Sequence, residues 1–222
     1  MKKFEQELAT LKQRVLDMGA LAESMVNHSW QGVAERNQRS LERAAADEPG
    51  LDRFQVDIDR EAIRLIAIYA PVARDLRLLL MIARITSELE RIGDQAVDNC
   101  EYARLLNEAP PSVGNLATMA GVVRRMLNEA LQTFRDEDAA KAQAVMQLDD
   151  QVDALYSAVF RELLDRAADD SGGRAQSTGL ILLARSLERI ADHATNVCEE
   201  VFYMVEGADI RHQTVGDTTP TG

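Results

Sequence analysis

Residues 88–101 read Glu-Leu-Glu-Arg-Ile-Gly-Asp-Gln-Ala-Val-Asp-Asn-Cys-Glu, and residues 186–199 read Ser-Leu-Glu-Arg-Ile-Ala-Asp-His-Ala-Thr-Asn-Val-Cys-Glu. Leu, Glu, Arg, Ile, Asp, Ala, Cys and Glu recur in register at an offset of 188 − 90 = 98. A weaker similarity links Gln-Val-Asp-Ile-Asp at 55–59 to Asp-Asp-Gln-Val-Asp at 149–153, at an offset of 153 − 59 = 94. Such self-similarity predicts two homologous halves.

Helical periodicity surrounds both copies. In the first segment, apolar residues recur at spacings of three and four at Phe4, Leu8, Leu11, Val15, Met18, Ala22, Met25 and Val26. Aromatic residues make up only 5% of the chain, whereas Ala, Leu, Arg and Glu dominate, and this balance favours helices. Glu48-Pro49-Gly50 and Pro71 are expected to interrupt the helices of the first half. We therefore expect an all-α fold of six long helices in two tandem three-helix bundles.

Proline, serine and glycine divide these helices into domains. Residues 108–112, Glu-Ala-Pro-Pro-Ser, are expected to link a first bundle at 1–108 to a second at 109–206. The second bundle should have helices at 113–134, 137–168 and 174–205. Residues 207–222 are rich in Asp, Thr and Gly, which cannot bury a core, so this tail is expected to be disordered.

Charge limits the possible partners. The net charge of −12 argues against nucleic acid as a partner and favours cations or basic protein surfaces.

The start, Met-Lys-Lys-Phe-Glu-Gln-Glu-Leu, is unlike a secretory signal, and no apolar run approaches the ~20 residues of a membrane span, so we expect a cytoplasmic protein. Cys100 and Cys198 lie within apolar helical patterns and are expected to be buried free thiols.

Each repeated helix carries a stripe of acidic side chains. Positions i, i+4, i+8 and i+11 fall close to one line on a helix. Two sets occupy such lines: Glu90, Asp94, Asp98 and Glu101, and Glu188, Asp192, Asn196 and Glu199. Neighbouring helices could add oxygens from Asp59 in the first half and from Asp149 and Asp153 in the second. Oxygen-rich, histidine-poor clusters suit Mg²⁺, Mn²⁺, Ca²⁺ or iron.

A solvated acidic face, paired with Arg91, Arg189 or a neighbouring helix, is the alternative to a metal site. These arginines point away from the stripes and are expected to be structural. His193 is expected at the surface or in a helix seam. Enzyme motifs are missing, since the sequence has no Glu-x-x-His, Walker loop, Cys-x-x-Cys or nucleophile elbow. A metal-dependent bundle enzyme and a metal-free helical scaffold remain as alternatives to a regulator.

The duplicated Glu-Arg-Ile-x-Asp, together with Pro-Val-Ala-Arg-Asp-Leu-Arg at 71–77, resembles the PhoU family over about residues 4–206. The resemblance implies two PhoU domains with Glu/Asp-x-x-x-Asp motifs that hold iron, zinc, manganese or magnesium. Residues 90–94, 188–192 and 149–153 match that motif. Gln55 departs from it and leaves only Asp59, which implies a weaker first cluster. Together with Asp98 and Asn196 from the stripes, the expected metal ligands are Asp59, Glu90, Asp94, Asp98, Asp149, Asp153, Glu188, Asp192 and Asn196.

The resemblance also implies a role without catalytic turnover. PhoU proteins repress the phosphate starvation response when phosphate is plentiful, by coupling a phosphate ABC transporter to its sensor histidine kinase. The implied partners are the ATPase subunit of the transporter and the kinase. Association with the membrane would run through these partners, and the protein is expected to form a homodimer.

Overall fold

The computed structural model describes residues 2–106, 114–169 and 174–210. Within these ranges every regular element is a helix, which confirms the all-α prediction. The elements are α1 (Lys2–Glu35), α2 (Gln38–Tyr69), α3 (Ala73–Ala103), α4 (Gly114–Asp136), α5 (Ala139–Met146), α6 (Asp149–Asp169) and α7 (Arg174–Glu206). The expected boundary at 108/109 and the tail from 211 lie outside the described residues.

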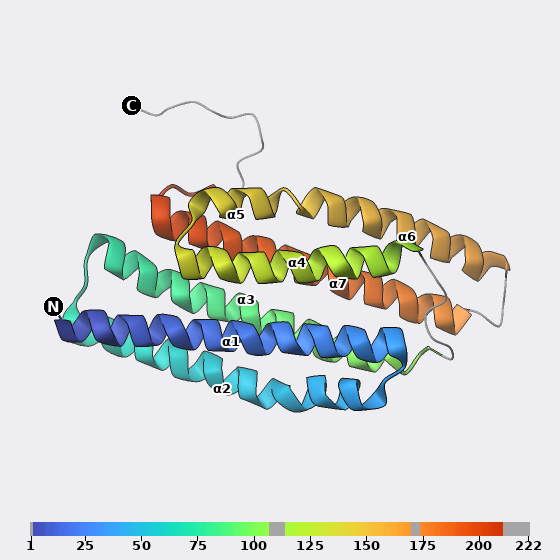
Figure 1. The fold of residues 1–222 in the computed structure, drawn as a ribbon, viewed down its shortest axis with the longest axis horizontal. Coiled ribbons are helices and arrows are strands. Elements are labelled where there is room, and N and C mark those ends of the chain that lie inside the picture. The colour runs from blue at the N-terminus through green and yellow to red at the C-terminus, as the bar shows by residue number, and fades with distance from the viewer. Residues whose placement is uncertain (1, 107–113, 170–173, 211–222) are drawn as a thin grey trace, which may run out of the picture.

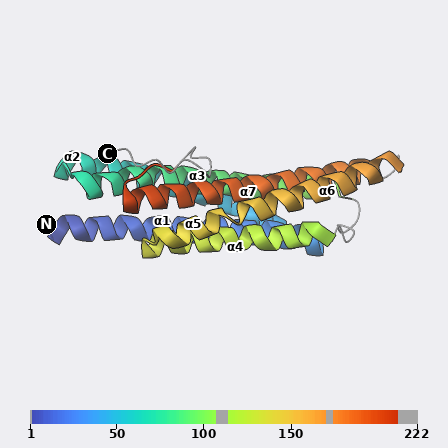
Figure 2. The same cartoon turned by 90° about the horizontal axis from the view of Figure 1, so that it is seen from above.

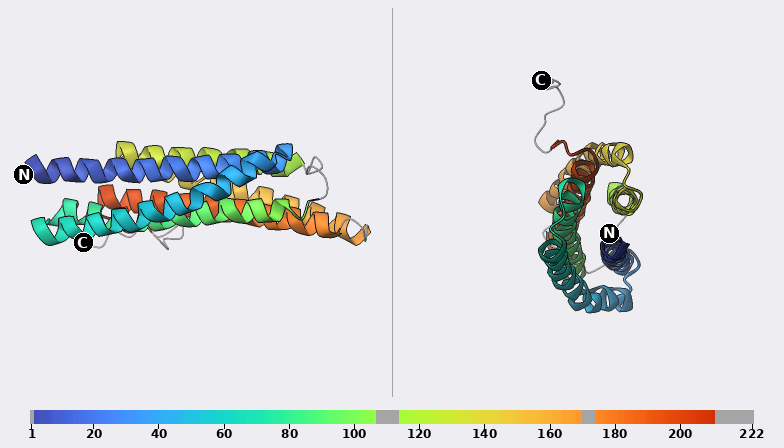
Figure 3. Two further views of the ribbon diagram at one scale, coloured as in Figure 1. Left: turned by 90° about the horizontal axis from the view of Figure 1, so that it is seen from below. Right: turned by 90° about the vertical axis from the view of Figure 1, so that its left-hand side faces the viewer.

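Two tandem bundles lie side by side (Figure 1). Helices α1, α2 and α3 pack on one another, and α4 to α7 form the second bundle. Viewed from above and end-on, α2, α3, α7 and α6 form one curved layer, and α1 and α4 lie together on one face of it (Figures 2 and 3). The two repeated helices, α3 and α7, form the main seam between the bundles and leave their other flank for the acidic stripes. No helix in the described ranges is long and apolar enough to cross a membrane.

Burial fixes the register of the repeat. Fully buried residues of the first bundle recur in the second at an offset of 119 − 18 = 101, namely Met18/Met119, Met25/Met126, Leu51/Val152 and Ile58/Val159. Helices α3 and α7 keep the offset of 98, as in Leu89/Leu187 and Ile92/Ile190. The offset of 94 inferred from residues 55–59 is therefore wrong for the second helices.

A close approach between α2 and α3 shows how the two cores differ. A Cβ on Gly93 would meet Leu51 Cδ2 at 2.1 Å, so the larger leucine depends on the glycine. At the equivalent positions the second bundle has Ala191 beside a smaller Val152, both buried. Compared with the first bundle, the second has a smaller side chain on its second helix and a larger one on its third. The combined side-chain volume at the contact therefore stays similar, as close packing requires.

The expected interruption at Pro49 is absent, because α2 runs through it without a break. Proline removes one helical donor, but buried side chains on both sides, including Leu41 and Leu51, hold the helix in place. The break occurs instead in the second bundle, where a turn at Gln147–Leu148 separates α5 from α6. At an offset of 101 this turn corresponds to positions 46–47, two to three residues before the proline, where α2 is continuous.

The two corners that join first and second helices share one geometry. Arg36 (φ 53°) and Glu137 (φ 52°) both adopt the left-handed conformation. Each precedes an N-cap residue, Asn37 or Asp138, whose side chain accepts a hydrogen bond from the backbone N–H of Ser40 or Lys141. These equivalent corners differ sharply in charge.

Candidate metal-binding acidic clusters

The first cluster joins acids of α2 and α3 and consists of Glu48, Asp52, Glu90, Asp94, Asp98 and Glu101. Burial raises the pKa of Glu90, and the charges of Asp94 and Asp52 raise it further. Burial likewise raises the pKa of Asp94, with Asp52 and Asp98 adding to the effect. The pKa of Glu48 is raised by burial and then by Asp52, Asp94 and Glu101. These acids therefore repel one another across the α2–α3 groove.

Asp59 lies outside this set of interacting acids. Its side chain accepts a hydrogen bond from Thr86 Oγ1 at 3.5 Å, and burial, with no neighbouring carboxylate, raises its pKa. The counterpart of Asp149–Asp153 is instead Glu48–Asp52, at the same offset of 149 − 48 = 101 as the buried core. Pro49 lies inside this Glu-x-x-x-Asp, and the helix break that it predicts conceals the motif in the sequence. Gln55 therefore does not weaken the first cluster.

The second cluster joins α6 to α7 and consists of Asp149, Asp153, Glu188 and Asp192. Burial raises the pKa of Asp149 to about 6, and the charges of Asp192, Asp153, Asp150 and Glu188 add to the effect. Asp149 Oδ1 and Glu188 Oε2 are buried without a hydrogen-bond partner. The other oxygen of Glu188 accepts a hydrogen bond from Arg185 at 2.6 Å. Two carboxylate oxygens thus remain available to a cation.

Asn196 and His193 belong to the α3–α7 seam. His193 Nδ1 lies 2.8 Å from Glu88 Oε2, and Asn196 Nδ2 donates to the same oxygen at 3.0 Å. Burial alone would raise the pKa of Glu88, but these bonds lower it. The expectation of a seam position for His193 is confirmed, whereas the amide of Asn196 is directed to Glu88 rather than to the second cluster. Arg91 also pairs with Glu88, at 3.3 Å within α3.

Both bundles match the family model of the PhoU domain, over residues 15–103 and 116–201. The chain belongs to the PhoU family. The two matched segments begin 116 − 15 = 101 residues apart and end 201 − 103 = 98 residues apart. These are the same two offsets that the buried residues show.

Curated relatives match the PhoU chain over nearly its whole length. The phosphate-specific transport system accessory protein PhoU homolog of Aquifex aeolicus is 36% identical and is aligned over 97% of this chain and 98% of its own. The homolog of Caulobacter vibrioides is 35% identical, with 96% and 94% covered. The crystal structure of PhoU from Pseudomonas aeruginosa superposes with a TM-score of 0.89 at 33% identity, covering 92% of this chain and all of that one.

The acids of this PhoU protein suit hard cations in their chemistry. Every donor in both clusters is a carboxylate oxygen, and the unpartnered oxygens of Asp149 and Glu188 lack the hydrogen bonds that buried acids need. In the described ranges, no three His, Cys, Asp or Glu side chains yet converge on one point that could hold an ion. Binding would therefore require the side chains to rotate inward, which is possible because Asp52, Asp94, Asp153 and Asp192 are exposed.

Proposed function

We propose that this protein regulates phosphate transport without catalysing a reaction, by coupling a phosphate ABC transporter to its sensor histidine kinase. The observation that carries this is the match of both bundles to PhoU, with relatives named as accessory proteins of the phosphate-specific transport system. The coupling to the kinase, and repression of the starvation response, come from the family resemblance. The acids support a non-catalytic role because many of them lie exposed along helix grooves rather than in an enclosed site.

Metal ions form part of this proposal. Glu48, Asp52, Glu90 and Asp94, flanked by Asp98, would hold a cation in the first cluster, and Asp149, Asp153, Glu188 and Asp192 would hold one in the second. Iron, zinc, manganese and magnesium are the candidates. A cation supplies positive charge that offsets the repulsion between these acids. Occupancy would therefore tie α2 to α3 and α6 to α7.

The acidic surface is suited to basic partner surfaces. Complementary charge accelerates and orients the encounter of proteins, and the net charge of −12 makes such steering strong. In the proposal a cytoplasmic homodimer reaches the membrane through the ATPase subunit and the kinase.

Two measurements test the proposal. The first is the metal content, by mass spectrometry, of untagged wild type and of a variant carrying Asp94→Ala and Asp192→Ala, with Asp17→Ala and Asp165→Ala as an equally charged control. We expect bound metal that the double variant loses and the control keeps. The second is a phosphate-responsive reporter in cells lacking the gene, where wild type should restore repression at high phosphate. Unrestored repression contradicts the regulatory role, and metal-free wild type favours the scaffold alternative.

A further inference from the structure

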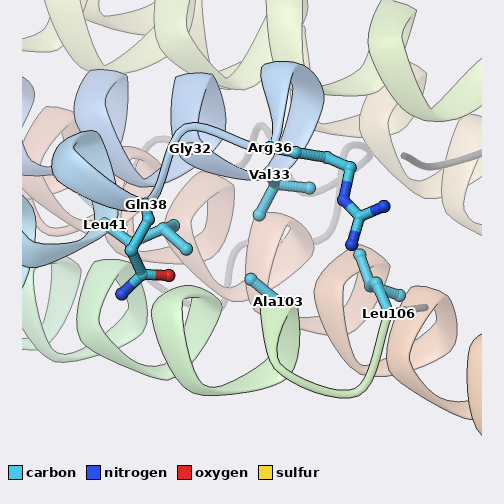
Figure 4. Close-up of a pocket in the computed structure, with 7 residues that line it drawn as sticks. All are labelled: Gly32, Val33, Arg36, Gln38, Leu41, Ala103 and Leu106. Atoms are coloured by element: carbon cyan, nitrogen blue, oxygen red, sulfur yellow. The ribbon is translucent and has the colours of Figure 1, made fainter. Parts of the chain in front are cut away.

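A pocket opens at the corner between α1 and α2 of the first bundle (Figure 4). Gly32, Val33, Leu41, Ala103 and Leu106 form its base, Arg36 and Gln38 also line it, and most of the surface that it exposes is polar. Its volume is about 120 Å³. Val33 and Ala103 point toward each other across the pocket, and the guanidinium of Arg36 reaches over it toward Leu106 (Figure 4). A water molecule needs roughly 10–15 Å³ measured in this way, so the pocket has room for a side chain of moderate size.

The charge around this pocket is opposite to that of the whole protein. Arg36 is exposed, and its guanidinium has no ion pair or hydrogen bond with the described part of the chain. Three more exposed arginines lie at the same end of the bundle, at positions 39, 43 and 104. Glu35 and Glu42 lie near these arginines, and each accepts a hydrogen bond from a glutamine four residues before it. Glu101, which is also exposed, lies three residues before Arg104. The corner is therefore locally basic on a chain of charge −12.

The equivalent corner of the second bundle shows what a filled corner looks like. There, at an offset of 137 − 36 = 101, Glu137 replaces the arginine and is bound by Lys12 Nζ and Arg74 Nη2, each at 2.5 Å, from the first bundle. Phe134 stands where the first bundle has Val33, and its side chain is fully buried. One corner thus has its charge paired by a neighbouring surface and its space filled. Within the described residues, the other has an unpaired charge and an open pocket.

We propose that the first corner binds an acidic segment of a protein partner, with a carboxylate on Arg36 and an apolar side chain in the pocket. A guanidinium binds a carboxylate through paired charge-assisted hydrogen bonds, and the partner's apolar side chain loses contact with water when it enters the pocket. The acidic remainder of the surface repels the same segment, so the basic corner fixes where it docks. This inference rests on the proposed function only for the identity of the partner.

Short peptides test the pocket without assuming a partner. The probes are acetyl-Asp-Glu-Leu-Glu-Asp-amide and the same peptide with glycine in place of leucine, titrated into the full chain at low salt and followed by amide NMR. We expect saturable shifts at Gly32, Arg36 and Leu106, with at least fivefold weaker binding of the glycine peptide. Arg36→Glu should weaken binding at least tenfold, and the second bundle shows that glutamate is accepted at such a corner. Arg39→Glu, with the same charge change outside the pocket, should change binding less than twofold.

Several outcomes would overturn the proposal. One is the absence of saturable shifts, and another is equal weakening by Arg36→Glu and Arg39→Glu, which would indicate general charge attraction. A third is binding of phosphatidylglycerol vesicles that depends on Arg36 without any binding of peptide, which would assign the corner to lipid headgroups.

The purified ATPase subunit of the phosphate transporter from the same organism separates this proposal from the proposed function. Binding that Arg36→Glu weakens tenfold and Arg39→Glu preserves supports both. Equal binding by wild type and Arg36→Glu shows that the corner is not the docking site. If wild type does not bind the subunit but binds the leucine peptide through Arg36, the corner proposal stands and the transporter assignment fails.

Discussion

Replacing Asp149 by asparagine should stabilise the metal-free protein at alkaline pH. Burial and four neighbouring acids raise the pKa of this carboxyl from 3.8 to about 6 in the folded state. A group whose pKa is raised on folding stabilises the protein fully below pH 3.8, and that contribution is lost as the pH rises through 6. A rise in the pKa of about two units corresponds to about 3 kcal/mol if solvent does not screen the interactions that cause it. Because solvent screens the exposed acids around it, we expect about 1–2 kcal/mol.

Urea unfolding followed by helical circular dichroism measures this effect. In EDTA at pH 8, Asp149→Asn should raise the free energy of unfolding by about 1–2 kcal/mol, and the gain should shrink toward zero near pH 4. Asp165→Asn, the same change on an exposed part of α6, should stay within about 0.5 kcal/mol of wild type. With Mn²⁺ the order should reverse, because wild type gains binding energy at both clusters and the variant only at the first. A variant less stable than wild type at pH 8 in EDTA would refute the reasoning.

Three further predictions concern the core, the corner and the thiols. Gly93→Ala should cost about 1–2 kcal/mol in urea unfolding because its Cβ would overlap Leu51, and adding Leu51→Val, which recreates the packing of the second bundle, should recover most of the loss. Glu137→Gln should cost about 1 kcal/mol at pH 7. Hydrogen bonding to a lysine, with an arginine also contributing, lowers the pKa of Glu137, so its stabilisation exists above pH 4.5, and the cost should vanish as the pH falls through the lowered pKa. Burial raises the pKa of Cys100 to about 11 and of Cys198 to about 12, so Ellman's reagent should react at least 100-fold faster in urea than with the folded protein.

Local periodicity explains what the sequence could predict. The spacing of Glu90, Asp94 and Asp98 depends only on helix geometry, and these acids do share one face with raised pKa values. The breaks were harder to place, since whether Pro49 ends a helix depends on packing from other elements. That one residue concealed the Glu48–Asp52 pair.

Contacts between distant helices could not be read from one helix alone. The pairing of Glu88 with His193 joins residues 105 positions apart, and no local pattern indicates it. The charge difference between Arg36 and Glu137 becomes informative only once burial has fixed the offset of 101. A register taken from buried positions along whole helices is more reliable here than one taken from a five-residue similarity.

The α3–α7 seam also determines the order in which the molecule can be completed during synthesis. Helices α1 to α3 leave the ribosome long before Arg174–Glu206 has been translated, and they can pack on one another at once. Until α7 arrives, Glu88 lacks His193, and the backbone carbonyl of Gln95 lacks the hydroxyl of Ser186, which donates to it at 3.1 Å. A nascent chain that lacks α7 therefore exposes this flank of α3, and α7 covers it once it has been made.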